Sequence, residues 1–165
     1  MHRFTTLAAA LLLAACSRHE ADPPTSPGGV RSATRSSFRL TIEREGGIGT
    51  FWIRKSVDGA TGRYVATTHR ICSVPQCQAA IDSASGTLPP AVVATLIGAV
   101  EEARLFSLRD DYGRTRGGAD MMVHTLTTQL DGRDKSVRGD DGTLPDAARR
   151  VEAALHEAIA KARAE

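Results

Sequence analysis

An Asp-Gly pair between two alternating runs is the feature that most constrains how this chain folds. Asp131 and Gly132 separate a run that ends at Leu130 from a run that begins at Arg133, and polar and apolar residues alternate in both. A two-residue hairpin loop of type I′ needs a positive φ at both central positions, which Asp tolerates and Gly adopts freely. We therefore predict a tight β-hairpin. Its cross-strand neighbours are Leu130 with Arg133, Thr128 with Lys135, and Leu126 with Val137.

The two faces of this hairpin differ in polarity, because successive side chains of a strand point to opposite sides. One face carries Met122, Leu126, Leu130 and Val137, and the other carries Thr125, Thr127, Gln129, Asp134 and Ser136. This pattern indicates a sheet with one covered face and one face in water.

The first fifteen residues have the features of a secretion signal. His2 and Arg3 precede an apolar run from 7 to 13 that is too short to span a bilayer, and small residues precede Cys16. Leu-Ala-Ala-Cys also resembles the lipobox of bacterial lipoproteins, which implies diacylglycerol on the Cys16 thiol, cleavage before Cys16 and acylation of the new amino group. An ordinary signal peptide, with Cys16 incidental, is the alternative. Ser17 after the anchor resembles an outer-membrane address, with the protein facing the periplasm.

The segment after Cys16 is rich in Pro, Gly, Ser and Thr and has almost no strongly apolar residues, which predicts a flexible tether. We therefore expect a signal peptide over 1–15, a lipidated cysteine and tether over 16–37, and a single domain over 38–165. The whole chain has 21 basic and 19 acidic residues, and cleavage removes Arg3, so the mature chain is close to neutral. This balance argues against nucleic acid as a partner.

The domain alternates between strand and helix patterns. Phe38, Leu40 and Ile42 alternate with polar residues, and similar runs follow over 50–57 and 63–71. We expect a short helix over 75–84, a longer helix after Leu88 and Pro89, the hairpin described above, and a last helix after residue 144. These elements predict an α+β fold: an antiparallel sheet of four to five strands in the order ββ(β)-α-ββ-α, with both helices packed on one face.

Cys72 and Cys77 are the two thiols that remain once Cys16 carries lipid. Outside the cytoplasm they are expected to form a disulfide that closes a small loop. A redox site is more typical of Cys-x-x-Cys, and a metal site needs more ligands than these thiols and His69, so both alternatives are weaker.

Motifs for catalysis or cofactor binding are not found in the sequence. No histidine pair has the HExxH spacing, no serine lies in a GxSxG elbow, and no glycine-rich loop offers a nucleotide site. His124 falls on the covered side of its strand and is expected to be a hydrogen-bonded, partly buried histidine. The acids at 110–111 and 140–141 lack calcium-loop spacing and are expected to be solvated. We therefore expect neither an enzyme nor a cofactor; a hydrolase would require His69 or His124 to meet an acid and a nucleophile in one cleft.

Several short motifs follow one another in a characteristic order. They are Glu-Gly-Gly-Ile at 45–48, Leu-Pro-Pro at 88–90, Ala-Arg-Leu-Phe-Ser-Leu at 103–108, Gly-Ala-Asp at 118–120, Asp-Gly-Arg at 131–133, Lys-Ser-Val-Arg at 135–138, Asp-Gly at 141–142 and Pro145. This order resembles the emfourin family, small bacterial proteins whose named member inhibits protealysin, a thermolysin-type zinc metalloprotease. The resemblance covers about residues 39–160 and is more specific after Leu88. The lipobox and the cysteine pair depart from the usual pattern of the family.

The resemblance implies a protein inhibitor that acts by occlusion, with a zinc metalloprotease as its partner. Such an enzyme prefers a bulky apolar side chain just after the scissile bond. Gly46, Gly47, Ile48 and Gly49 offer one branched residue among glycines, so this loop is a candidate inhibitory or partner-binding loop. Alternatively, the glycines only permit the turn and Ile48 folds back over the core. A different class of function is a structural or accessory lipoprotein that docks another envelope protein through its exposed sheet.

Overall fold

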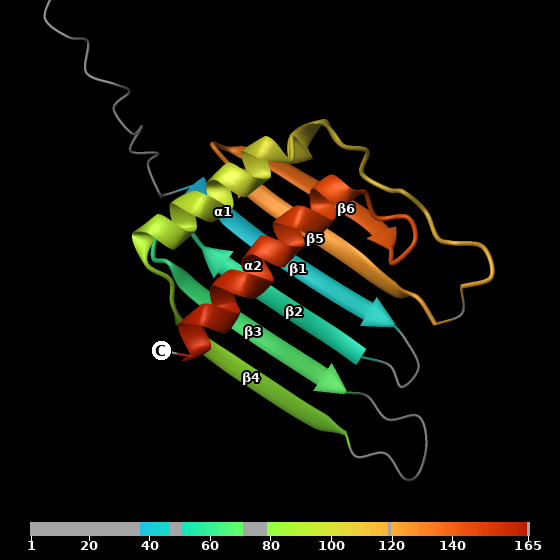
Figure 1. Cartoon of the computed structure of the whole chain (residues 1–165), viewed down its shortest axis with the longest axis horizontal. Coiled ribbons are helices and arrows are strands. Elements are labelled where there is room, and N and C mark those ends of the chain that lie inside the picture. Colours follow the sequence, from blue (N-terminus) through green and yellow to red (C-terminus); the bar gives the residue numbers. More distant parts are fainter. Residues whose placement is uncertain (1–36, 47–50, 71–78, 119, 165) are drawn as a thin grey trace, which may run out of the picture. The chain divides into compact units, whose positions relative to one another are not determined.

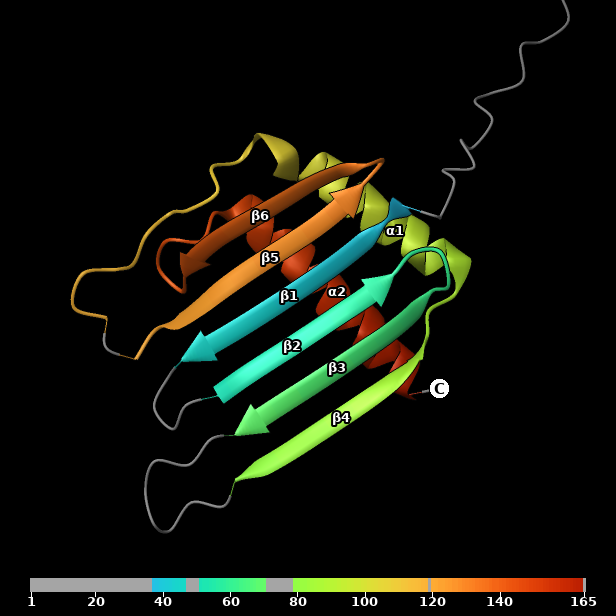
Figure 2. The same ribbon diagram turned by 180° about the vertical axis from the view of Figure 1, so that it is seen from behind.

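A six-stranded antiparallel sheet with two helices on one face forms the domain (Figures 1 and 2). The computed structural model describes residues 37–46, 51–70, 79–118 and 120–164. The elements in chain order are β1 (Arg39–Gly46), β2 (Phe51–Asp58), β3 (Arg63–Arg70), β4 (Ala80–Thr87), α1 (Pro90–Glu102), the short 3-10 helix η2 (Leu105–Ser107), β5 (Met122–Leu130), β6 (Arg133–Asp140) and α2 (Asp146–Ala164). The strands lie in the order β4-β3-β2-β1-β5-β6.

Several expectations fall on residues outside this description. They concern the signal peptide, Cys16 and the tether up to residue 36, the pair Cys72 and Cys77, and Gly47, Ile48 and Gly49 of the glycine loop. No helix in the described part of the chain is long and apolar enough to cross a membrane.

The predicted hairpin is confirmed in its register and its turn. Strands β5 and β6 pair antiparallel with Leu130 opposite Arg133, and this register continues along the hairpin as expected. Asp131 has a φ of 52° and Gly132 a φ of 73°, as a type I′ turn requires. The local turn chemistry therefore sets the pairing of the whole hairpin.

Strand β4 corrects two expectations: the short helix over 75–84 and a sheet of only four to five strands. Residues 80–87 instead form a continuous antiparallel ladder with β3, from Arg63 opposite Thr87 to Arg70 opposite Ala80. The observed order is thus ββββ-α-ββ-α. In a short segment of small residues, apolar spacing cannot distinguish a helix from a strand, and here pairing with the exposed edge of β3 decides between them.

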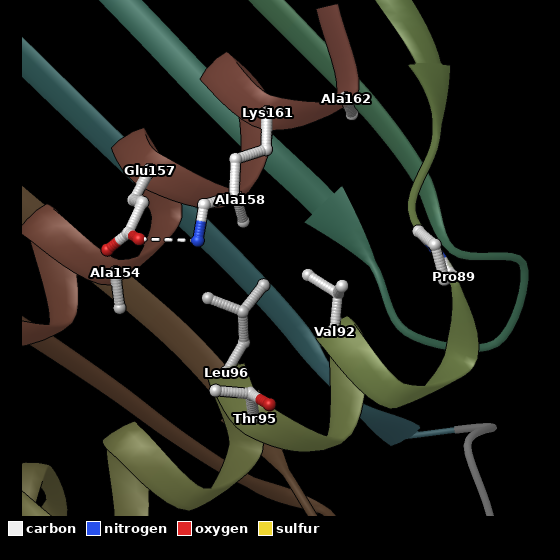
Figure 3. A pocket seen from close by; sticks show the side chains of 9 residues that line it. All are labelled: Pro89, Val92, Thr95, Leu96, Ala154, Glu157, Ala158, Lys161 and Ala162. Atoms are coloured by element: carbon white, nitrogen blue, oxygen red, sulfur yellow. Dashed lines mark ion pairs between the residues drawn. The ribbon is translucent and has the colours of Figure 1, made fainter. Parts of the chain in front are cut away.

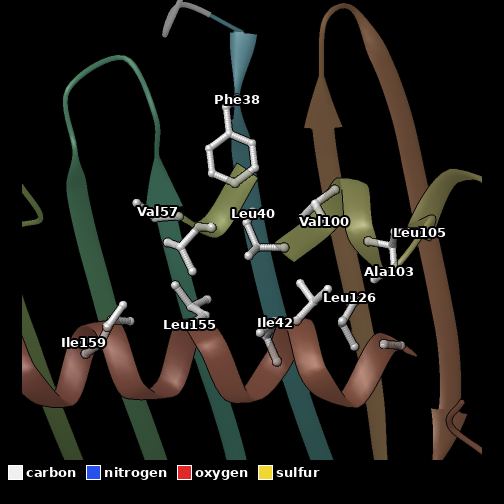
Figure 4. Close-up of a cluster of buried hydrophobic side chains, with 14 of the residues drawn as sticks. Phe38, Leu40, Ile42, Val57, Val100, Ala103, Leu105, Leu126, Leu155 and Ile159 are labelled. Carbon is white, nitrogen blue, oxygen red and sulfur yellow. The ribbon is translucent and has the colours of Figure 1, made fainter. Parts of the chain in front are cut away.

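The hydrophobic core lies between the helices and the covered face of the sheet (Figure 4). Leu155 of α2 points towards Val57 and Ile42 of the sheet, and Ile159 lies one turn further along the same side of the helix. The buried apolar residues of the two helices recur at helical spacing, with Val93, Leu96 and Val100 on α1 and Ala148, Val151, Leu155, Ala158 and Ile159 on α2. All buried apolar residues of the described chain lie between Phe38 and Ile159, so this segment contains its own core.

Candidate functional site

Strands β1 and β3 finish, and β2 and β4 start, at the same end of the sheet, which we call the loop end. Here β1 finishes at Gly46, β2 starts at Phe51, and β5 starts at Met122 opposite Gly46. Gly46 has a φ of 118°, and a Cβ at this position would lie 3.1 Å from the Met121 carbonyl oxygen. Only glycine fits this backbone without strain, so the candidate glycine loop departs from a sterically defined position.

Three consecutive apolar residues, Phe51, Trp52 and Ile53, begin β2 at the loop end. All three are partly exposed, and none belongs to the core cluster or packs against it within the described chain. Phe51 and Ile53 lie on the helix-bearing face and Trp52 lies on the open face, because side chains alternate along the strand. The loop end therefore presents apolar side chains on both faces of the sheet.

Charged and polar neighbours border these apolar side chains. Phe51 lies opposite Arg70, whose guanidinium stands 5.4 Å from the centre of the phenyl ring. Trp52 lies between Glu45 on β1 and His69 on β3. An apolar centre with a polar border is the usual composition of a protein-binding surface.

A partly buried charge network supports the loop end from the helix side. His124 of β5 is hydrogen-bonded through Nδ1 to Glu152 of α2 and through Nε2 to Asp141, each at 2.8 Å. Nε of Arg44 lies 3.5 Å from Glu152, and its Nη2 lies 3.9 Å from Asp141. Asp141 also accepts a hydrogen bond from the backbone N–H of Met122 at 2.7 Å. The network thus joins α2 to the strand ends that carry the glycine loop.

The protonated form of His124 fits this network best. Burial disfavours the charged ring, but hydrogen bonds to Glu152 and Asp141 outweigh burial and raise the pKa of His124 above 6.5. Only the imidazolium donates from both nitrogens at once, and it balances two carboxylates against two cations, His124 and Arg44. Burial favours the neutral acids, yet the bonds from His124 lower the pKa values of Asp141 and Glu152.

His156, one turn along α2, titrates in the opposite direction. Its Nε2 lies 3.9 Å from Glu152 and has no hydrogen-bond partner within the described chain. Burial and the nearby charge of Lys55 lower the pKa of His156 below 6.5. The two histidines therefore make opposite contributions to stability near neutral pH.

We predict that an NMR titration of the two rings will show His124 with a midpoint above 6.5 and His156 with a midpoint below it. A histidine whose pKa is higher in the folded than in the unfolded state stabilises the folded state when it is protonated. The contribution of His124 is therefore complete below about pH 6.5, and it is lost as the pH rises through the pKa of the folded state. The contribution of His156 is complete above that value and is lost on acidification. Replacing His124 with Gln should remove the loss of stability on the alkaline side. Equal midpoints for both rings would contradict the prediction.

The acids at 140–141 are not solvated loop acids, which corrects that expectation. Asp140 is buried, and its carboxylate accepts bonds from the backbone N–H groups of Thr115, Gly142 and Thr143 and from the hydroxyls of Thr115 and Thr143. The bond from the Thr115 N–H is the largest of the effects that lower the pKa of Asp140 strongly. Asp140 therefore holds the 113–115 loop against the β6–α2 turn. At 110–111, Asp110 pairs with Lys135 and is largely exposed.

His124 is hydrogen-bonded, as the strand pattern predicted, and it is more deeply buried than expected, so its geometry does not fit general-base catalysis. Both of its nitrogens are occupied by carboxylates, and only 4% of its side chain is exposed. His69 lies on the open face beside Trp52, on the opposite side of the sheet, so the structure does not bring the two histidines together. Among the described residues, no group of three or more His, Cys, Asp and Glu side chains is arranged to hold a metal ion.

A groove of about 270 Å³ lies between α1 and α2 on the side away from the sheet (Figure 3). Val92 and Leu96 line it from α1, and Ala154 and Ala158 line it from α2. An ion pair between Glu157 and Lys161, 2.7 Å long, lies at its border. The remaining lining is mostly apolar, so the groove lacks the converging polar groups typical of a catalytic site.

The charge network was missed in the sequence, although two residues carried a signal. Arg44 continues the alternation of Leu40 and Ile42, and Glu152 lies on the apolar stripe of α2 between Ala148 and Leu155. A charged residue at a position that the pattern assigns to the core indicates a buried partner of opposite charge. No known family profile matches the chain, and a comparison with curated protein sequences finds no match.

Proposed function

We propose that this chain is a lipid-anchored envelope protein that binds a protein partner through the loop end of its sheet. In the form implied by its resemblance to emfourin, it inhibits a thermolysin-type zinc metalloprotease by occluding the active-site cleft. It is anchored through Cys16, most simply in the outer membrane facing the periplasm, and performs no chemistry of its own. The apolar residues Phe51, Trp52 and Ile53, which lie outside the core, are the observation that carries this proposal.

A binding role for the loop end follows from its support as well as its composition. Apolar side chains that contribute nothing to the core gain free energy when a partner removes them from water. The network of His124, Glu152 and Asp141 fixes the adjoining strand ends, so little further ordering is needed on binding. In this arrangement Ile48 would supply the apolar residue for the protease cleft, and β2 would supply the surface beside it.

An accessory lipoprotein that docks another envelope protein is the second candidate. The face of the sheet opposite the helices favours it, because no described helix covers that face (Figure 2). Its side chains are mostly polar, including Thr41, Arg54 and Thr67. Inhibition is absent in this alternative, and binding uses the middle of the open face rather than the loop end.

We expect the chain to inhibit a purified thermolysin-type protease stoichiometrically in a peptide-hydrolysis assay. Ile48→Asp tests the glycine loop, Phe51→Ala tests the helix-bearing face, and Trp52→Ala tests the open face. A truncated side chain at the centre of the interface should weaken inhibition by about 30-fold, which corresponds to about 2 kcal/mol. Circular dichroism of the Phe51 and Trp52 variants should be unchanged, because neither side chain belongs to the core cluster.

Val65→Ala is the matched control for these variants. Val65 is an apolar residue on the open face and is 39% exposed. It lies on the same face of β3 as His69 but four residues further from the loop end. It should leave inhibition unchanged. No inhibition of several such proteases at micromolar concentrations of the chain would refute the inhibitor proposal. Binding of an envelope protein that is lost in Arg54 and Thr67 variants would then support the docking alternative.

A further inference from the structure

In the part of the chain that the structure describes, strand β4 forms an open edge of the sheet, whereas the opposite edge is partly covered. At the β6 edge, the backbone of Arg138 is bonded to Asp110 and Tyr112 of the preceding loop, at 2.8 and 2.9 Å. Strand β4 pairs with β3 alone, and no other described backbone group bonds to its outer side (Figure 2). An open edge is a template for an additional strand.

The residues that direct their backbone groups outwards can be identified from the ladder. The N–H of Leu88 donates to the carbonyl of Gly62 at 2.8 Å, so this pair is hydrogen-bonded inwards. Inward and outward residues alternate along an antiparallel strand, so the even-numbered residues of β4 bond to β3. The residues whose N–H and C=O groups point to the free edge are therefore Ile81, Ser83, Ser85 and Thr87.

The usual protections of an exposed edge are weak in β4. The strand has no proline, no lysine and no interruption of its register with β3 over eight residues. Most of its side chains are small, and Ile81 on the open face is 70% exposed. Its one charged residue, Asp82, lies 3.9 Å from Arg163 of α2. Natural sheets avoid such edges, or use them for pairing.

We propose that a second copy of this chain pairs with β4, antiparallel, about a twofold axis through Ala84. In this register Ser83 lies opposite Ser85 of the second copy, and Ile81 lies opposite Thr87. All outward-directed groups of the four residues are then paired, which gives about eight hydrogen bonds at two per pair. The two sheets join into one, and the helices of both copies lie on the same side.

The side chains of β4 are compatible with this self-pairing. Asp82 faces Gly86 of the second copy, where no side chain restricts the carboxylate. The two Asp82 side chains stand on opposite sides of the axis, separated by about 13 Å or more at 3.3 Å per residue. Only the two Ala84 methyl groups meet on the axis. Because the contact consists mainly of backbone bonds and small side chains, we expect a dimer that exchanges with monomer.

Cysteine cross-linking tests the register directly in the full-length chain. Ala84→Cys places two thiols opposite each other on the axis, at a non-hydrogen-bonded pair where the Cβ atoms are about 4.5–5.5 Å apart. A mild oxidant that accepts two electrons and two protons should join them in a disulfide-linked dimer, seen on a non-reducing gel. Thr87→Cys is the control, because its two copies are about 20 Å apart in this register.

A second pair of variants separates edge pairing from random collision. In the Ala84→Cys background, Ser85→Pro removes an N–H that points outwards, and it leaves the β3–β4 ladder intact. It should abolish the cross-link, and Ser85→Ala should preserve it. Three results would overturn the proposal. They are equal cross-linking at positions 84 and 87, cross-linking that survives Ser85→Pro, and no more disulfide-linked dimer than the unchanged chain forms. Exclusive cross-linking of Ala84→Cys to another protein would also overturn it, in favour of a heterologous strand.

Discussion

Replacing Glu152 with alanine is expected to destabilise the domain by about 3–5 kcal/mol, the usual effect of removing one partner from a buried ion pair. Glu152 has only 8% of its side chain exposed, and it contacts both His124 and Arg44. Its loss leaves His124 without a partner at Nδ1 and leaves Arg44 with Asp141 alone. Chemical denaturation at about pH 6, where His124 carries its proton, should show the full effect.

Glu157→Ala is the matched control on the same helix. Glu157 pairs with Lys161 one turn later, but both side chains are mostly exposed. An exposed pair of this kind adds little to stability because water screens it, so this variant should have nearly the same free energy of unfolding as the unchanged chain. If both variants had the same small effect, the network around His124 would not be a structural support of the loop end.

Replacing Leu155 with alanine should lower the free energy of unfolding by about 2–5 kcal/mol, the range for buried leucines. Leu155 is fully buried on α2 and points towards Ile42 and Val57 of the sheet (Figure 4). The truncated side chain leaves a cavity between the two layers, which the rigid sheet cannot fill. Urea denaturation followed by circular dichroism gives the loss directly.

Val65→Ala again provides the comparison, because it removes apolar atoms from an exposed site on the other face of the sheet. It should change the free energy of unfolding by less than about 0.5 kcal/mol. A similar loss in both variants would mean that Leu155 does not hold α2 against the sheet. The difference between the variants therefore measures the packing of the two layers.

The charge network and the loop end have related roles in this fold. Arg44 of β1 lies opposite His124 of β5, two residue pairs from the last pair of this ladder at the loop end. The bonds of Asp141 to the backbone of Met122 continue this support to the last residue of the ladder. A surface that binds by occlusion depends on such rigidity, because a mobile surface loses conformational entropy on binding.

The sequence alone determined the elements whose signals are local. The Asp131-Gly132 turn predicted its own register, since its φ angles admit one pairing of the flanking strands. Periodicity alone also predicted the two helices, the polar-apolar alternation of β1 and β5, and the α+β class. Each of these features is decided within a few residues of chain, so the pattern suffices.

Only the tertiary structure decided the features that depend on distant partners. Residues 80–87 become a strand because the edge of β3 is free to pair, which their own composition does not reveal. From the sequence, Asp140 and Asp141 resemble solvated loop acids. In the folded chain Asp140 is hydrogen-bonded to Thr115, in the loop before β5, and Asp141 is hydrogen-bonded to His124 of β5. The partners of long-range hydrogen bonds and buried charges depend on which strands and helices pack together. A local sequence pattern does not predict those partners, because they lie far away along the chain.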